Sequence, residues 1–140
     1  MTLILKGIVK MAKFLDIQQD AIKRYGITLC YGEFCKNDWQ RTHVHVREKR
    51  ICKWYPKNSI QSTITLLHEI GHIMTNKSIY RRCEQEYYAT VWAFKEARET
   101  YHLDIPDSVI KDYNDYVKME HDRGIRRGGK LPPYNTMILK

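Results

Sequence analysis

Residues 63–77 read TITLLHEIGHIMTNK, an apolar run that two histidines and a glutamate interrupt. Side chains four residues apart on a helix lie on the same face, so His68 and His72 can direct their imidazoles toward one point. Burying these polar groups in an apolar helix would be costly unless they bind something. The H-E-x-x-H spacing therefore predicts a zinc site, with His68 and His72 as ligands and Glu69 as the general base for a zinc-bound water.

A catalytic zinc ion usually has three protein ligands and one water, so one more ligand must come from elsewhere in the chain. The candidates are Glu84, Glu86, His102, Cys83, His43, His45 and Cys52. The chain lacks the third histidine that metzincins place soon after the motif, which excludes that class.

Glu86 is the favoured third ligand because of the residues that share its helical face. Ala89 and Ala93 follow it by three and seven residues, and such small side chains let a second helix approach closely. Gly71, inside the motif, would relax the packing on the opposing helix in the same way. Glu84 lies about 200° from Glu86 around the helix and would face elsewhere.

Hydrophobic periodicity predicts an α+β fold with four helices and a small antiparallel sheet of about three strands. The expected helices cover residues 11–25, 60–76, 82–101 and 106–122. The expected strands cover residues 27–31, 42–47 and 50–55. The sheet would pack with the first helix, the H-E-x-x-H helix and the helix that carries Glu86. Gly26 is expected to end the first helix, and Ser59 or Ser62 to cap the second.

The chain has 140 residues and a formal net charge of +8. That length predicts a single domain, which we place at residues 1–122. Residues 123–140 contain basic and no acidic side chains, and their glycines and prolines, from Gly124 on, should interrupt regular structure. We interpret this segment as a flexible, solvated basic tail, with binding to nucleic acid or to an acidic partner as the alternative.

Neither a signal peptide nor a membrane-spanning helix is predicted. Lysines divide the apolar residues at the start of the chain, and no run of about 18 apolar residues occurs. The expectation is a soluble, cytoplasmic protein without a membrane partner. The cysteine spacing matches neither paired zinc knuckles nor a redox motif, so buried, reduced thiols are expected, although CYGEFC could bind a second metal. The cysteines are Cys30, Cys35, Cys52 and Cys83.

Further side chains are candidates for contacts with a substrate or a transition state. His43 and His45 lie on one face of their strand by the two-residue period, where solvent exposure is the simpler interpretation and substrate contact the functional one. Tyr87 and Tyr88 could stabilise an oxyanion. The many aromatic residues and the positive charge are compatible with nucleic-acid binding, but helix packing explains the tyrosines and no nucleic-acid-binding motif occurs. Nucleic acid is therefore not the favoured partner.

The motif HEIGH, followed from Glu86 by EYYATVWA, resembles the zinc peptidase domain of the ImmA/IrrE family. The usual wording in that family is H-E-[LI]-[GA]-H and then E-x-x-A-N-x-F-A. The likeness covers about residues 11–100 and implies a small zincin-like domain. It also implies that His68, His72 and Glu86 bind Zn²⁺ and that Glu69 is the catalytic base.

Two positions depart from the family's wording. Thr90 replaces the usual Asn and Trp92 the usual Phe, and both are expected to alter packing rather than the metal shell. The helix-turn-helix segment that many relatives carry is missing, as is the apolar Met-Pro segment that often follows the third ligand. The chain thus resembles the peptidase module alone.

The resemblance implies a zinc-dependent endopeptidase that cleaves a protein partner, by analogy a repressor or an antitoxin-like regulator of a phage or mobile element. An extended substrate could pair with an exposed sheet edge at residues 42–47 or 50–55. The alternative is a non-enzymatic regulatory protein that uses the zincin scaffold and contacts protein or nucleic acid through its basic surface. A zinc hydrolase of a non-peptide amide also fits H-E-x-x-H, and the oligomeric state is open.

Overall fold

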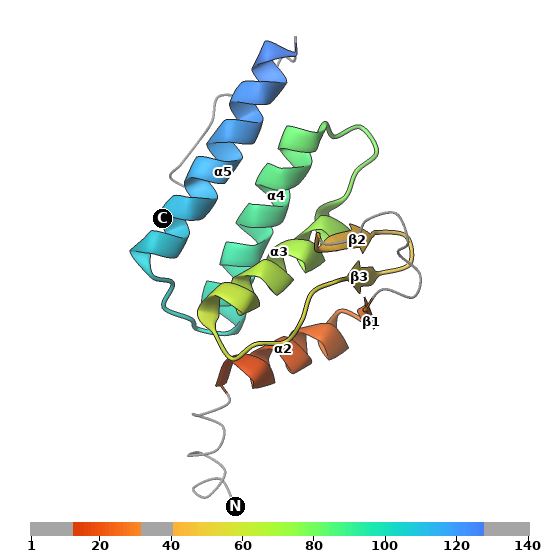
Figure 1. Cartoon of the computed structure of the whole chain (residues 1–140), viewed down its shortest axis with the longest axis vertical. Helices are drawn as coiled ribbons and strands as arrows, with labels where there is room; N and C mark the ends of the chain where they lie inside the picture. The colour runs from red at the N-terminus through yellow and green to blue at the C-terminus, as the bar shows by residue number, and fades with distance from the viewer. Residues whose placement is uncertain (1–12, 32–40, 128–140) are drawn as a thin grey trace, which may run out of the picture. The chain divides into compact units, whose positions relative to one another are not determined.

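The computed structural model describes residues 13–31 and 41–127, which have an α+β fold (Figure 1). These residues divide into two compact units, one ending at Leu66 and one beginning at Leu67. The division falls within helix α3 (Ile60–Thr75). The start of the first expected helix, the residue Cys35 and the end of the basic tail lie outside the described residues.

Helix α2 (Lys13–Arg24) is the first described element of the first unit and ends one residue before the predicted end at Tyr25. Gly26 follows it with a φ of 66°, a left-handed conformation that glycine adopts without steric cost, so the predicted stop is confirmed. Gln18 fixes the helix within the unit. Its Nε2 amide donates hydrogen bonds to the Lys57 carbonyl (2.8 Å) and to Thr63 Oγ1 (2.9 Å).

The first unit contains a mixed three-stranded sheet in the order β1-β3-β2. The strands are β1 (Thr28–Cys30), β2 (His43–His45) and β3 (Arg50–Cys52). β2 and β3 pair antiparallel because a short turn joins them, in which the Lys49 amide donates to the Val46 carbonyl (3.2 Å). β1 pairs parallel with β3, so the expectation of an antiparallel sheet is wrong for this pair. The connection from β1 to β2 is long enough for β3 to be inserted between them rather than added outside.

The central position of β3 also corrects where a sheet edge could accept a substrate. Residues 50–55 contain this central strand and offer no edge, so β2 is the edge strand of the two expected segments. The strands are shorter than the sequence indicates because turns begin close to their ends. Val46 already belongs to the turn after β2, and Lys53, with a positive φ of 60°, follows the end of β3.

Helix α3 begins at Ile60, and its cap is one of the two predicted serines. Ser59 Oγ accepts a hydrogen bond from the Ser62 amide (3.1 Å), so Ser59 is the N-cap. Trp54 packs into the same unit and donates its indole N–H to the Ser62 carbonyl (3.2 Å). Within residues 13–31 and 41–66, the fully buried apolar side chains are Ala21, Ile51, Cys52, Ile64 and Leu66.

The described part of the second unit, which ends at residue 127, contains the end of α3 and three further helical segments. These are α4 (Arg82–Lys95), the π-helix η1 (Glu96–Thr100) and α5 (Asp107–Arg126). The helix predicted over residues 82–101 is thus an α-helix whose final turn widens to π geometry. Figure 1 shows α5 returning beside α4 in the opposite direction, as the short connection between them requires.

Helix α5 extends to Arg126, so the expectation that Gly124 interrupts it is wrong. A glycine inside a helix costs only about 1 kcal/mol, which packing can offset. Gly124 lines a pocket together with residues of α4. The Arg127 amide donates to the Arg123 carbonyl (3.1 Å), and the first residues of the expected tail therefore continue the last helix.

Gly71 allows α3 and α4 to approach closely, as the sequence predicts. A Cβ added at Gly71 would lie 2.5 Å from the carbonyl oxygen of Ala89 and 3.0 Å from its Cα. Ala89 and Ala93 are fully buried. The small residues predicted to lie under the third ligand are therefore in the core of the second unit.

The described cysteines and helices bear on two expectations from the sequence. Cys30, Cys52 and Cys83 are buried and form no disulfide, as predicted. Among residues 13–31 and 41–127, no helix combines the length and the apolar character that crossing a membrane requires.

Candidate metal centre

Helices α3 and α4 bring His68, His72 and Glu86 together. The Nε2 atoms of the two histidines lie 3.1 Å apart, and Glu86 Oε2 lies 2.9 Å from Nε2 of His68 and 3.2 Å from that of His72. His68 and Glu86 are buried, His72 is partly exposed, and the group could hold a metal ion. In a tetrahedral zinc site with bonds of about 2.0–2.1 Å, neighbouring ligand atoms lie about 3.3 Å apart. The three atoms fit such an ion with small shifts.

The other candidates for the third ligand have different positions. The Glu84 carboxylate accepts a hydrogen bond from the Arg81 amide (3.3 Å) and so serves the N-terminus of α4. His102 is exposed, and Cys83 lines a separate pocket. The remaining three candidates belong to the first unit, where they form a group of their own: His43, His45 and Cys52.

Thr90 determines which nitrogen of His68 carries a proton. Its hydroxyl lies 2.7 Å from the Glu86 carbonyl oxygen, which can only accept, so the hydroxyl donates there. The same Oγ1 lies 3.2 Å from Nδ1 of His68 and must accept a hydrogen bond from that nitrogen. When the ring is neutral, as metal binding requires, its Nε2 is unprotonated and faces His72 and Glu86. In the protonated ring, which is the form found without a metal ion when Glu86 is ionised, Nε2 donates a hydrogen bond to Glu86 instead. The expectation that Thr90 affects packing rather than the metal shell is wrong, because its hydroxyl orients a predicted ligand.

The electrostatics of the group favour a cation. Burial would raise the pKa of the Glu86 carboxyl, but hydrogen bonds from His68 and His72 outweigh it and lower that pKa well below its usual range. Burial would lower the pKa of His72, but the hydrogen bond and charge of Glu86, together with the charge of Glu69, raise it. An ionised carboxylate beside two imidazoles stabilises a positive charge at the point where they meet.

Glu69 follows His68 on α3 and is partly exposed, as a general base that must reach water requires. Its carboxylate is close enough to His72 for its negative charge to act on that imidazole. The group of three side chains that could hold a metal ion does not include it. Glu69 therefore lies beside the candidate ligands, where the motif predicts a general base.

Sequence reasoning misses two tyrosines of α5 that lie against the group, Tyr113 and Tyr116. Their ring centroids lie 5.7 and 6.4 Å from that of His68. Their spacing of three residues, which puts both on one face of the last helix, is the signal that could have found them. Burial and the negative charge of Glu86 raise the pKa of Tyr116 to about 12, so its hydroxyl stays protonated at neutral pH and can donate a hydrogen bond.

Tyr87 and Tyr88 form an aromatic cluster with Tyr80. The rings of Tyr80 and Tyr88 stack with centroids 4.8 Å apart, and those of Tyr87 and Tyr88 lie 5.3 Å apart. Successive residues of a helix point about 100° apart, so neither Tyr87 nor Tyr88 shares the face of Glu86. Their contact with a transition state stays a prediction.

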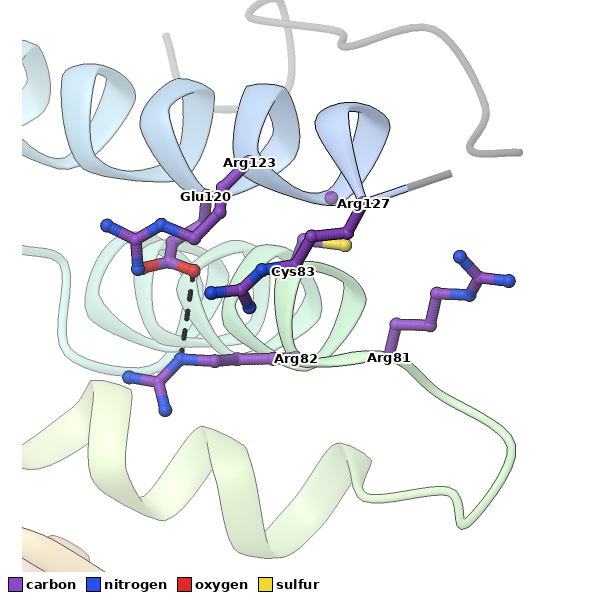
Figure 2. A pocket seen from close by; sticks show the side chains of 7 residues that line it. Arg81, Arg82, Cys83, Glu120, Arg123 and Arg127 are labelled. Carbon is purple, nitrogen blue, oxygen red and sulfur yellow. Dashed lines mark hydrogen bonds and ion pairs between the residues drawn. The ribbon is translucent and has the colours of Figure 1, made fainter. Parts of the chain in front are cut away.

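Arginines surround a pocket of about 90 Å³ between the start of α4 and the end of α5 (Figure 2). Its lining residues are Arg81, Arg82, Cys83, Glu120, Arg123, Gly124 and Arg127. Glu120 is almost fully buried and lies 3.2 Å from Arg123 and 3.7 Å from Arg82. The positive charge of Arg82 also acts on Tyr116 and on His72, where it opposes the rise in the pKa of each group. This arginine therefore connects the pocket with the candidate metal centre.

Comparison of the chain with models of known protein families, with curated proteins and with solved structures finds no match. The resemblance to the ImmA/IrrE family therefore stays a prediction that rests on HEIGH and EYYATVWA. The geometry is independent of any relative. Two imidazoles and a carboxylate meet at one point, with a second carboxylate beside them.

Proposed function

We propose that the chain is a zinc-dependent endopeptidase. The observation that carries the proposal is the group of His68, His72 and Glu86, with Glu69 next to it. Two imidazoles, one ionised carboxylate and a second carboxylate nearby are the parts that a catalytic zinc site needs, since three ligands leave the fourth position for water. The resemblance of the motifs to the ImmA/IrrE family supports the same assignment.

The residues of the group have distinct roles in this proposal. Zinc held there would supply a water of lowered pKa and would polarise a peptide carbonyl. Glu69 would accept a proton from the water and pass it to the departing amine. Tyr116, whose pKa of about 12 keeps its hydroxyl protonated, would donate a hydrogen bond to the oxyanion, with Tyr113 as the second candidate. Thr90 would keep the His68 ring in the tautomer that binds metal.

The proposed substrate is a protein partner, by resemblance a repressor or an antitoxin-like regulator of a phage or mobile element. This choice and a cytoplasmic location rest on the motifs and the composition. The predicted substrate contacts His43, His45, Tyr87 and Tyr88 remain part of the proposal, and Tyr113 and Tyr116 are added to them because their rings lie against His68.

Mass spectrometry of new peptide termini in a co-expressed host or phage proteome tests this function. Glu69→Gln should keep bound zinc and slow cleavage by at least about a hundredfold, because general acid–base catalysis contributes that much. Glu84→Gln is the matched control, since it makes the same change on the neighbouring helix and should cleave like the wild type. Equal cleavage by Glu69→Gln would remove the proposed base, and a wild type that binds no zinc would refute the proposed centre.

The arginine pocket supports a second candidate function, a non-enzymatic regulatory protein that binds an acidic partner or nucleic acid. Arg81, Arg82 and Arg127 are exposed, and Glu120 offsets only part of the positive charge around the pocket. Salt-dependent DNA binding that Arg81→Ala and Arg127→Ala weaken, without cleavage of any partner, would favour this function. The presence of Glu69 favours the enzyme, since a structural metal site has no need of a base.

A further inference from the structure

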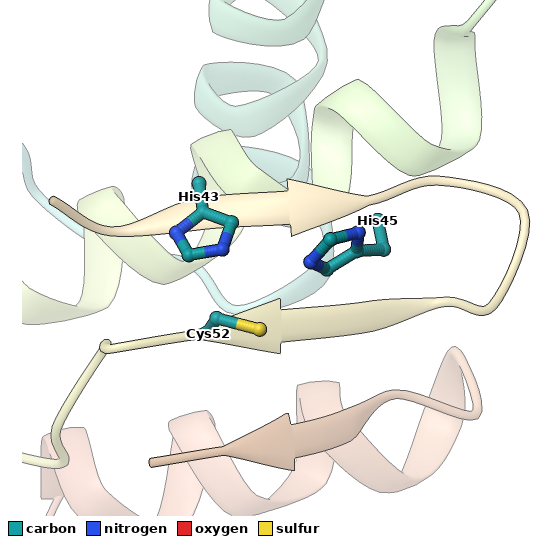
Figure 3. A group of neighbouring side chains, drawn as sticks. All are labelled: His43, His45 and Cys52. Atoms are coloured by element: carbon teal, nitrogen blue, oxygen red, sulfur yellow. The ribbon is translucent and has the colours of Figure 1, made fainter. Parts of the chain in front are cut away.

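The first unit contains a second group of metal-binding side chains, formed by His43, His45 and Cys52 (Figure 3). Each residue offers one ligand atom, and these atoms all lie within 4.8 Å of one another. The sequence does not place them at one point, because its simplest interpretation is solvent-facing histidines and a buried thiol. The fold brings them together.

The register of the β2–β3 ladder explains why the three side chains meet. Cys52 is the ladder partner of His43, and partners across an antiparallel pair point to the same face with Cβ atoms about 5 Å apart. His45 lies two residues from His43 on β2 and therefore points to that face as well. The two imidazole rings lie beside each other in Figure 3, with centroids 5.2 Å apart and the sulfur next to them.

A main-chain carbonyl fixes the tautomer of His43 that can bind a metal. Its Nδ1 lies 2.9 Å from the carbonyl oxygen of Arg41, and a carbonyl can only accept, so Nδ1 carries the proton. The neutral ring then has its lone pair on Nε2, which is the state in which imidazole binds a metal. A main-chain carbonyl thus has the same role for His43 that the Thr90 hydroxyl has for His68.

Cys52 lies at the closed side of the group. It is fully buried, whereas His43 and His45 are partly exposed, so an ion can enter from solvent past the imidazoles. Lys53, directly after Cys52, has a φ of 60°, which is rare for a residue with a side chain, and its carbonyl accepts a hydrogen bond from the Thr42 hydroxyl (3.0 Å). This bond joins the end of β3 to the start of β2 and fixes Cys52 relative to the histidines.

We propose that His43, His45 and Cys52 bind a second divalent transition-metal ion, of the zinc class, within the first unit. Two imidazoles and a thiolate favour zinc over magnesium or calcium, which prefer oxygen ligands. Binding forms a metal–sulfur bond and releases the thiol proton to solvent, and three protein ligands leave one position for water. The site uses no residue of the second unit and does not depend on the proposed zinc centre there, and a metal ion bound by His43 and His45 would replace the substrate contacts proposed for these two side chains.

Cobalt(II) distinguishes the two groups, because a cobalt–thiolate bond produces a charge-transfer absorption that a site with two histidines and a glutamate lacks. The wild-type protein should bind two equivalents of Co²⁺ and show the thiolate band. Cys52→Ser should lose one equivalent and the band. His45→Gln should also lose one equivalent of Co²⁺ and the thiolate band. Its affinity for the ion should fall by more than the ten- to hundredfold that follows when only a residue hydrogen-bonded to a ligand is removed. Because His45 is partly exposed, this variant serves if Cys52→Ser does not fold.

Two control variants separate the groups. Cys83→Ser replaces another buried cysteine and should keep both equivalents and the band. His68→Gln should lose the other equivalent and keep the band. A wild type without the thiolate band, or a band that survives in both Cys52→Ser and His45→Gln, would overturn the proposal, whatever the outcome for peptide cleavage.

Discussion

The two groups of metal-binding side chains are built on different backbone geometries. His68 and His72 lie four residues apart on one helix, and Glu86 joins them from the next helix. His43 and Cys52 come from two strands and meet because the ladder pairs them. Helical spacing can be read from the sequence, whereas ladder register depends on strand order and on the turn between strands. The helical group is therefore visible in the sequence and the strand group only in the fold.

The two groups also differ in the hydrogen-bond acceptor that fixes the tautomer of one histidine in each group. The hydroxyl of Thr90 accepts a hydrogen bond from His68, whereas the main-chain carbonyl of Arg41 does so for His43. Substitution can remove a side-chain partner but not a carbonyl. Substitutions around His68, His72 and Glu86 can therefore test the role of the acceptor, whereas substitution of Arg41 cannot.

Glu86→Ala should have the largest effect, because it removes a ligand and the negative charge of the helical group. Zinc affinity of that group should fall by more than about a hundredfold, measured by isothermal titration, while the ion bound through Cys52 should stay. Glu84→Ala removes a carboxylate two residues away as the control. It should bind zinc normally and lose about 1 kcal/mol of unfolding free energy with the hydrogen bond to the helix N-terminus. Unchanged zinc binding by Glu86→Ala would exclude Glu86 as a ligand.

Thr90→Val should weaken zinc binding by about ten- to hundredfold, because Nδ1 of His68 loses the acceptor that fixes its tautomer. Threonine and valine have similar volumes, so the packing of α4 should change little in this variant. Thr90→Ser keeps a hydroxyl and should retain most of the affinity. If the valine variant binds zinc as tightly as the serine variant, the hydroxyl has no part in orienting the ligand.

Gly71→Ala tests the distance between α3 and α4. Helix propensity alone predicts a gain of about 1 kcal/mol for this change. The added Cβ would lie 2.5 Å from the Ala89 carbonyl oxygen, and such overpacking costs about 1–3 kcal/mol, so we expect net destabilisation in urea unfolding. A more stable variant would mean that the helices are not in close contact.

The pH dependence should be the smallest effect. Burial would lower the pKa of His72, but the hydrogen bond and charge of Glu86, together with the charge of Glu69, raise this pKa above its usual value. In zinc-free protein the pair of His72 and Glu86 adds stability below the unfolded pKa of His72 and loses it as pH rises through the folded pKa. Zinc needs neutral His72, so its affinity should fall by up to about tenfold per pH unit on acidification through that range.

Calorimetry can measure this pH dependence directly. The increase in Tm on adding zinc should be larger at about pH 8 than at about pH 6. His72→Gln should lose most of this difference, because the titrating ligand is gone. An increase that does not depend on pH in the wild type would argue against His72 as a ligand.

Much of the fold could be predicted because its signals are local. Gly26 ends α2 and Ser59 caps α3, each within a few residues of the element it delimits. The pair of His68 and His72 follows from helical geometry alone. Glu86 could be preferred because small residues share its face, and Gly71 indicated where a second helix could approach.

The features that could not be predicted depend on contacts between distant segments. The parallel pairing of β1 with β3 is a property of strand order. Tyr113 and Tyr116 reach His68 only because α5 returns beside α4. The sequence suggests that Thr90 is a packing residue. In the structure its hydroxyl lies between the Glu86 carbonyl oxygen and Nδ1 of His68.

Arg82 gives the second unit a route for thermodynamic coupling. It lines the arginine pocket, approaches Glu120 at 3.7 Å, and its positive charge acts on His72. An anion that neutralises Arg82 would reduce the repulsion felt by a cation at His72. Because such coupling is reciprocal, a cation held there would strengthen anion binding by the same factor. Occupancy of the pocket and occupancy of the candidate metal centre would then report on each other.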